Sequence, residues 1–353
     1  MSLQSTPPGE RVATRRLETF VRIAGPEDAP PLVLLHGNVS SSIFWSETIA
    51  AMAADHRVIA PDLRGFGDTE RAAVDATRGL RDFTDDLEAL LATLGVDGKP
   101  VHMVGWSLGG SAAMRYAIDH PQAIASLTLI APGSPYGFGG TKGSDGAPCY
   151  PDYAGSGAGL SNPQLCLALA AGDRGEGSQT SPRNVMRTLY FDPSFTLPPA
   201  LEDAFVEGML ATVISDDNYP GTRRASVHWP YFAPGDRGVS NAVSPKYCDL
   251  TALADLDPRP PIVWLRGSND RLVADRALSD LGVLGEMGMI PGWPGPAVFP
   301  AQPMLAQTRA VLESYRANGG SFREEVFDGC GHGPHIERPG RWIELLRETV
   351  GSA

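Results

Sequence analysis

The chain has 353 residues, of which 42% are hydrophobic and 20% are charged, and this is the composition of an ordinary globular protein. Its formal net charge of −12 argues against a nucleic-acid partner, because an acidic surface repels polyanions. No segment approaches the roughly 18 to 20 consecutive apolar residues that a membrane span needs, so no membrane partner is expected either. Residues 1–16 are polar and lack the apolar stretch of a secretory signal, which predicts a cytoplasmic protein.

The cysteines agree with that location. Cys149, Cys166, Cys248 and Cys330 are scattered and lack the spacing of metal ligands. We interpret them as free thiols in a reducing cytoplasm, and a bridge between Cys149 and Cys166 stays open as an alternative. The sequence therefore predicts no metal site.

Short apolar runs alternate with helical patterns in two stretches of the chain. The runs that predict strands are 17–23, 32–35, 58–60, 101–104, 127–130, 262–265 and 325–327. The patterns that predict helices are 80–94, 111–120, 304–315 and 342–350. Strands that alternate with helices imply an α/β fold with a mostly parallel sheet covered on both faces.

The alternation breaks in the middle of the chain. The features found there are a Gly-, Pro- and Ser-rich stretch, two helical patterns and an aromatic loop, at 132–163, 165–171, 201–214 and 228–232. We interpret residues 132–257 as a lid inserted into an α/β core that comprises 1–131 and 258–353. A second insert, 282–303, is rich in proline, and irregular stretches of this length are usually functional or mobile.

The strongest functional signal is Gly-Trp-Ser-Leu-Gly at 105–109, which lies between a predicted strand and a predicted helix. A sharp strand-to-helix turn needs glycine on both sides of the serine, because larger side chains would clash with the strand and the helix. The turn places Ser107 at a helix N-terminus, where amide N–H groups favour developing negative charge. We therefore predict that Ser107 is a nucleophile.

A second signal, Leu-Leu-His-Gly-Asn at 34–38, follows a predicted strand directly. A glycine at position 37 lets the backbone approach a substrate carbonyl closely. We predict an oxyanion hole formed by the backbone N–H groups of Asn38 and Leu108, each contributing about 3 kcal/mol of transition-state stabilisation. His36 is expected to shape the loop rather than to react.

The base and the acid are predicted from two motifs late in the chain. A serine hydroxyl needs a base, and a histidine with a pKa near 7 serves best. We choose His332, which follows a glycine turn after the last strand, over His335, which would be a supporting or helix-capping residue. Asp270 follows the 262–265 strand and would hold the histidine tautomer and stabilise its imidazolium form.

The order of these motifs resembles that of the α/β-hydrolase superfamily. The residues that carry the resemblance are His36-Gly37, Asp62-x-Arg64-Gly65-x-Gly67, Gly105-x-Ser107-x-Gly109, Asp270 and Gly331-His332. The chain looks most like bacterial esterases and lactonases with an inserted lid, over about residues 12–131 and 258–350. This resemblance implies an eight-stranded, mostly parallel sheet with helices on both faces, and no cofactor. Asp62 and Arg64 are expected to fix a turn, and the separation of 62 residues between Asp270 and His332 is longer than a single-helix crossover needs.

A serine nucleophile predicts acyl transfer through an acyl-enzyme. We expect the substrate to be a small to medium, apolar or aromatic carboxylic ester or lactone. The aromatic residues predicted to line its pocket are Phe44, Trp45, Trp106, Tyr136 and Trp229.

Three alternatives stay open. A C–C hydrolase and a cofactor-free perhydrolase would use the same triad, and a non-catalytic protein of this fold would only bind a small ligand. Retention of all three triad residues favours an enzyme. The sequence is compatible with a monomer and with a homodimer.

Overall fold

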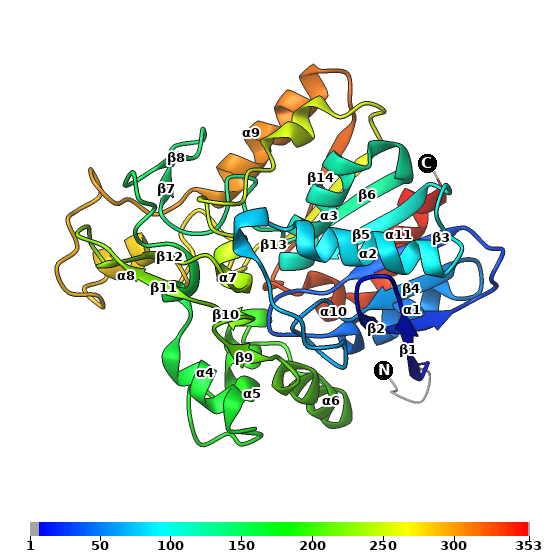
Figure 1. The fold of residues 1–353 in the computed structure, drawn as a ribbon, viewed down its shortest axis with the longest axis horizontal. Coiled ribbons are helices and arrows are strands. Elements are labelled where there is room, and N and C mark those ends of the chain that lie inside the picture. The colour runs from blue at the N-terminus through cyan, green and yellow to red at the C-terminus, as the bar shows by residue number, and fades with distance from the viewer. Residues whose placement is uncertain (1–6, 352–353) are drawn as a thin grey trace.

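The computed structural model describes residues 7–351, and its centre is one eight-stranded sheet (Figure 1). The strands of this sheet are β1 (Gly9–Ala13), β2 (Glu18–Ala24), β3 (Pro31–Leu35), β4 (Arg57–Pro61), β5 (Val101–Trp106), β6 (Ile124–Ile130), β13 (Ile262–Gly267) and β14 (Phe322–Phe327). Their spatial order is β1-β2-β4-β3-β5-β6-β13-β14. The pairs β1–β2 and β2–β4 are antiparallel and the other neighbouring pairs are parallel, which confirms the expected sheet.

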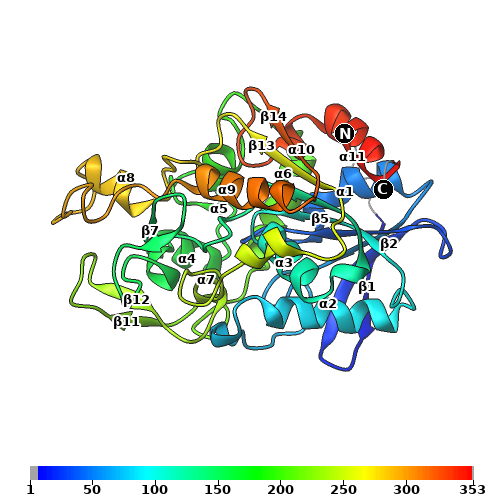
Figure 2. The same ribbon diagram turned by 90° about the horizontal axis from the view of Figure 1, so that it is seen from above.

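Helices cover both faces of the sheet. The helices outside the middle of the chain are α1 (Ser46–Met52), α2 (Arg81–Thr93), α3 (Leu108–Asp119), α8 (Leu281–Glu286), α9 (Met304–Ala317), α10 (Pro334–Glu337) and α11 (Pro339–Gly351). Figure 2 shows α2 and α3 on one side of the sheet and α1 and α11 on the other. Among residues 7–351, no helix is both long and apolar enough to cross a membrane. All four cysteines are free thiols, as expected.

Residues 131–261, which we call the inserted segment, connect β6 to β13. Its elements are β7 (Thr141–Lys142), β8 (Ala147–Pro148), the 3-10 helix η5 (Gly157–Leu160), α4 (Pro163–Ala170), α5 (Pro182–Val185), the π-helix η6 (Met186–Tyr190), α6 (Pro199–Leu210), β9 (Ile214–Ser215), β10 (Tyr219–Pro220), β11 (Arg223–Ala225), β12 (Phe232–Pro234), α7 (Val239–Ala242) and the 3-10 helix η7 (Thr251–Asp255). Its strands pair only with one another, in three two-stranded ladders, and none joins the main sheet. In Figure 1 most of these elements lie beyond one end of the sheet. The predicted lid, 132–257, falls inside this segment, and its function as a lid stays a prediction.

The structure corrects two expectations about single elements. The helix predicted over 201–214 ends at Leu210, and Ile214 lies in β9. The proline-rich insert 282–303 begins inside helix α8 and packs against the inserted segment. There the Trp229 indole donates a hydrogen bond to the Pro291 carbonyl at 3.0 Å. The two irregular stretches of the chain are therefore packed together.

An aromatic stack joins the inserted segment to the core. Phe205 of α6 stacks on Phe44 with ring centroids 4.1 Å apart and planes 11° apart. Phe205 is 1% exposed and belongs to the same apolar cluster as the strands of the sheet. Burial of this kind makes the segment and the core one cooperative unit.

Substitution of Phe205 by alanine is expected to lower the free energy of unfolding of the whole chain by about 3–5 kcal/mol, because it removes a buried ring and leaves a cavity. Urea unfolding followed by fluorescence and by circular dichroism measures the change. Val227→Ala, at a side chain that is 88% exposed, is the control and should shift stability by less than about 0.5 kcal/mol. A separate early transition of the inserted segment, with the sheet unaffected, would contradict this account.

Candidate active site

The turn at Ser107 has the strained geometry that the sequence predicts. Ser107 lies between β5 and α3 with φ 55° and ψ −117°, a backbone conformation that residues other than glycine rarely adopt. A Cβ atom on Gly105 would lie 2.2 Å from the Gly109 carbonyl oxygen, and one on Gly109 would lie 2.2 Å from the Leu35 carbonyl oxygen. Both positions therefore require glycine. Trp106 and Leu108 are buried, whereas Ser107 stays partly exposed.

The loop after β3 runs beside this turn. A Cβ atom on Gly37 would lie 3.2 Å from the Ser107 Cβ atom. Within residues 7–351, neither the Asn38 N–H nor the Leu108 N–H has a hydrogen-bond acceptor. Two free donors next to a serine are what an oxyanion hole requires.

The Asp270 carboxylate and the His332 ring are joined directly. Asp270 Oδ2 accepts a hydrogen bond from His332 Nδ1 at 2.8 Å, and both side chains are 3% exposed. Asp270 Oδ1 accepts from the backbone N–H groups of Leu272 and Val273, at 2.8 and 3.0 Å. The loop that carries Asp270 is thus braced by its own backbone in spite of the long connection to His332. Because Nδ1 carries the proton, Nε2 is the unprotonated nitrogen of the neutral ring.

Ser107 and His332 are connected through Trp106. The Trp106 indole N–H donates to the His332 carbonyl oxygen at 2.8 Å, and the two rings lie 5.6 Å apart. Within the described chain the Ser107 hydroxyl makes no hydrogen bond, so the hydrogen bond from this hydroxyl to His332 Nε2 is not formed in this structure. Such contacts are often long in enzymes without substrate and tighten in the substrate complex.

His335 occupies a different environment from His332. Its two ring nitrogens are buried without a hydrogen-bond partner in the part of the chain that is described. Burial lowers the pKa of His335 to about 3, so the ring is neutral. It packs 4.7 Å from the Trp45 ring and 5.2 Å from the Trp106 ring. His335 therefore supports the site by packing and lacks the carboxylate partner that a base needs.

The remaining motif residues hold the backbone in place, as expected. His36 Nδ1 donates to the Gly37 carbonyl at 2.8 Å, and Nε2 accepts from the Leu63 N–H at 2.9 Å. Asp62 accepts from two backbone N–H groups, at 2.7 and 2.9 Å. Arg64 forms an ion pair with a carboxylate of α2 at 2.7 Å. These contacts shape the loop and the turn and leave none of the three side chains free to react.

The five aromatic residues predicted to line the pocket lie in different places. Trp106 and Phe44 are buried next to the nucleophile turn, with rings 5.5 Å apart. Trp45 is fully buried, with its ring 4.7 Å from the His335 ring. Tyr136 is partly exposed, and Trp229 belongs to a separate apolar cluster with residues of the second insert. Trp229 is thus separated from the main apolar cluster, which contains Phe44, Trp45 and Trp106 and against which Tyr136 packs. Their role as pocket residues stays a prediction.

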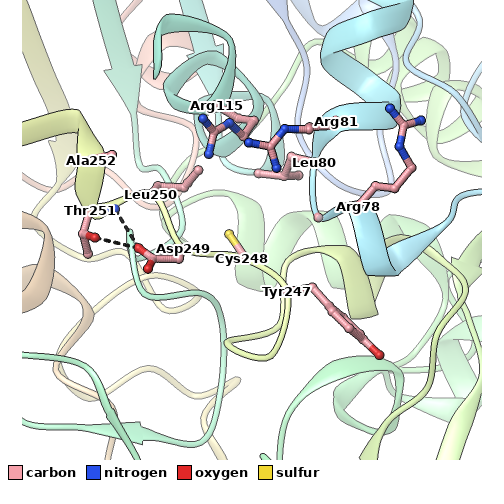
Figure 3. A pocket seen from close by; sticks show the side chains of 11 residues that line it. Arg78, Leu80, Arg81, Arg115, Tyr247, Cys248, Asp249, Leu250, Thr251 and Ala252 are labelled. Carbon is pink, nitrogen blue, oxygen red and sulfur yellow. Dashed lines mark hydrogen bonds between the residues drawn. The ribbon is translucent and has the colours of Figure 1, made fainter. Parts of the chain in front are cut away.

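A cavity of about 310 Å³ lies at another place, between the start of α2, α3 and residues 247–252 (Figure 3). Arg78, Arg81 and Arg115 line it, and each already pairs with an aspartate. It contains none of the predicted site residues.

Among residues 7–351, no group of three His, Cys, Asp or Glu side chains is placed to hold a metal ion.

Sequence reasoning did not identify Glu337 as part of the site. Its Oε1 accepts from the Gly331 N–H at 2.7 Å, and its Oε2 accepts from the Asp192 N–H at 2.9 Å. It therefore joins the loop of His332 to the inserted segment. Its place five residues after His332 was a usable signal, but the partner in the inserted segment was not visible in the sequence.

The comparisons with known proteins agree with this architecture. A family model described as alpha/beta hydrolase fold matches residues 30–147. The chain is similar to an uncharacterized carboxylesterase (nap) of Bacillus subtilis, with 36% identity over 122 residues, which are 34% of this chain and 39% of that protein. It is also similar to carboxylesterase YbfK of the same organism, with 34% identity over 34% of this chain and 40% of that protein. The match thus spans about two fifths of the length of these relatives.

Two solved structures are similar to this chain over nearly its whole length. Carboxylesterase CesB from Bacillus subtilis has a TM-score of 0.59 at 17% identity, over 98% of this chain and 92% of that one. The enol-lactonase from Burkholderia xenovorans has a TM-score of 0.60 at 17% identity, over 97% of this chain and 100% of that one. The chain has the α/β-hydrolase fold. The resemblance drawn from the motifs is confirmed at this level.

The buried carboxyl group of Glu337 predicts a pH-dependent stability. Burial raises the pKa of Glu337 from 4.5 to about 7, and the charge of Asp192 adds to the rise, whereas the two backbone N–H groups and Arg338 lower the pKa. In the pH window between these two pKa values, the folded chain keeps a proton on Glu337 that the unfolded chain has released. Stability therefore falls as pH rises through this window and is level above it.

We expect Glu337→Gln to remove this dependence, so that the wild type loses stability relative to the variant between about pH 5 and pH 8. Urea midpoints of both proteins at the two pH values measure the difference. Glu344→Gln, on the exposed side of α11, is the control, and its difference from the wild type should stay constant. A wild type that gains stability relative to Glu337→Gln on going to pH 8 would show that the assignment is wrong.

Proposed function

We propose that this protein is a serine hydrolase that cleaves a carboxylic ester or a lactone through an acyl-enzyme. The observation that carries the proposal is the 2.8 Å hydrogen bond between His332 and Asp270, formed next to the strained turn of Ser107. The free N–H groups of Asn38 and Leu108 support it. The likeness to proteins named as carboxylesterases and as an enol-lactonase supports the same reaction class.

The first half of the reaction follows from these positions. The Ser107 hydroxyl attacks the acyl carbon while His332 Nε2 takes its proton. Asp270 keeps the ring oriented and stabilises the imidazolium. The N–H groups of Asn38 and Leu108 donate to the oxyanion as the tetrahedral intermediate forms.

The second half returns the site to its initial state. The imidazolium donates its proton to the leaving alkoxide, and the acyl group stays on Ser107. Water then attacks the acyl-enzyme while Nε2 takes a proton from it, and the imidazolium returns this proton to Ser107 Oγ as the bond to the acyl carbon breaks and the acid product is released. For a lactone, the alcohol and the acid are two ends of one product.

The surroundings of Ser107 support an apolar or aromatic substrate of small to medium size. Trp106 lies directly before the serine, and the rings of Phe44 and Tyr190 lie 5.5 and 5.6 Å from its ring. Aromatic faces of this kind favour apolar groups. A cytoplasmic location is proposed as well, supported by the four free cysteines.

A fluorophosphonate probe is expected to label the wild type at Ser107, as located by mass spectrometry, and the same protein should hydrolyse p-nitrophenyl butyrate. Ser107→Ala should lose the label and at least about 10⁴-fold in kcat, because no other group can form the acyl-enzyme. Ser314→Ala, at an exposed serine of α9, should behave as the wild type. A folded wild type with neither label nor turnover would contradict the proposal and favour a protein that only binds its ligand.

The role of Asp270 gives a second expected outcome. Asp270→Asn preserves the shape of the side chain but favours the wrong tautomer of His332, so kcat for p-nitrophenyl butyrate should fall about 10³- to 10⁴-fold. Steady-state kinetics measure the change. Asp257→Asn, whose side chain is 87% exposed at the opposite end of β13, should keep kcat within about twofold. An Asp270→Asn protein with more than a tenth of the wild-type kcat would exclude Asp270 as the acid.

A further inference from the structure

A short part of the inserted segment, residues 190–192, contacts three loops that carry candidate catalytic groups. Tyr190 is the last residue of the π-helix η6. Its hydroxyl lies 3.0 Å from the Asn38 carbonyl oxygen and 3.1 Å from the Val39 carbonyl oxygen. Its own carbonyl accepts a hydrogen bond from the Gly333 N–H at 2.8 Å. One residue thus connects the oxyanion loop to the loop of His332.

Asp192 extends these contacts to the acid. Its carboxylate accepts a hydrogen bond from the Asn269 side chain at 2.8 Å, next to Asp270. Its N–H donates to Glu337, as described above. The approach is close, because a Cβ atom on Gly331 would lie 2.6 Å from the Phe191 carbonyl carbon. The segment is therefore docked backbone to backbone and is part of the site's framework.

The loop that Tyr190 contacts is strained. Val39 has φ 47°, a left-handed conformation that is a genuine outlier for a β-branched residue. Such a conformation costs on the order of 1–3 kcal/mol and persists only where the surroundings hold it. The restraints on this loop include the Tyr190 hydroxyl, which is shared between the two carbonyls, and the bond from the Val39 N–H to Asn38 Oδ1 at 3.1 Å. The preceding carbonyl, that of Gly37, accepts from the Ser40 hydroxyl and from His36 Nδ1, each at 2.8 Å.

We infer that Tyr190 is a positioning residue for the proposed reaction: its buried hydroxyl holds the Asn38–Val39 backbone so that the Asn38 N–H is aimed at the oxyanion. The inference rests on the proposed function. Burial raises the pKa of Tyr190, so the hydroxyl stays a neutral donor across the working pH range. The oxyanion forms only on the way to the transition state, so misdirection of this donor lowers kcat and leaves KM nearly unchanged.

The chain offers a matched control for removal of the hydroxyl. Tyr315 of α9 is also buried, and its hydroxyl donates to a single backbone carbonyl, that of Pro260, at 2.6 Å. Pro260 precedes β13, at the end of the sheet away from Asp270. Tyr190→Phe and Tyr315→Phe each remove one buried hydroxyl and leave the ring in place.

With p-nitrophenyl butyrate as the probe, Tyr190→Phe is expected to lower kcat about 10- to 100-fold with KM within about twofold, whereas Tyr315→Phe keeps both within about twofold. Thermal unfolding of both variants is measured alongside. If Tyr190→Phe retains kcat, or if the two variants lose kcat and melting temperature in parallel, the hydroxyl has only a structural role and the inference is overturned.

Amide hydrogen exchange of the peptide that covers residues 36–40 tests the same contact without substrate. Exchange in this peptide should be about tenfold faster in Tyr190→Phe and unchanged in Tyr315→Phe. Unchanged exchange in both variants overturns the inference, even in an active enzyme. A wild type without turnover or fluorophosphonate label would instead contradict the proposed function. The exchange result would still decide whether the Tyr190 hydroxyl holds the loop in place.

Discussion

The left-handed backbone of Ser107 is the constraint on which the rest of the site depends. It lets β5 turn into α3 within one residue and leaves the serine partly exposed at the end of the sheet. The turn closes only because two glycines allow main chain to touch main chain on both sides. Since the parallel strands β3, β5, β13 and β14 end at the same edge, their following loops arrive around this one point. Asp270 and His332 meet there although 62 residues separate them.

The inserted segment helps to hold the loops around Ser107 in place and does not only cover them. The stack of Phe205 on Phe44 and the contacts of Tyr190 and Asp192 tie it to three loops at the edge of the sheet. Its other end packs with the second insert through Trp229. If a lid opens, residues 190–192 would therefore have to stay in place to keep the oxyanion loop aligned with Ser107. Movement in the outer part, where the two inserts meet, is compatible with a fixed framework at the serine.

The features that were predictable from the sequence are those with a local pattern. The turn of Ser107 has glycines at fixed spacing between a strand and a helix, and Asp270 and His332 each lie in the loop that follows a strand. The edge strand β1 was missed because its side chains are mostly exposed and show no buried face. Tyr190 was missed because its contact with Asn38 spans 152 residues of chain, and no local pattern records such a contact. Aromatic composition likewise did not reveal that Trp229 packs in a separate cluster.

A crystal structure of the fluorophosphonate adduct tests the central claim most directly, because the phosphoryl group resembles the tetrahedral intermediate. The account predicts a bond from phosphorus to Ser107 Oγ. It also predicts a phosphoryl oxygen about 2.7–3.1 Å from the N–H groups of Asn38 and Leu108, with the Tyr190 hydroxyl still on the Asn38 carbonyl. An adduct on another residue, or a phosphoryl oxygen directed away from these two N–H groups, would contradict it.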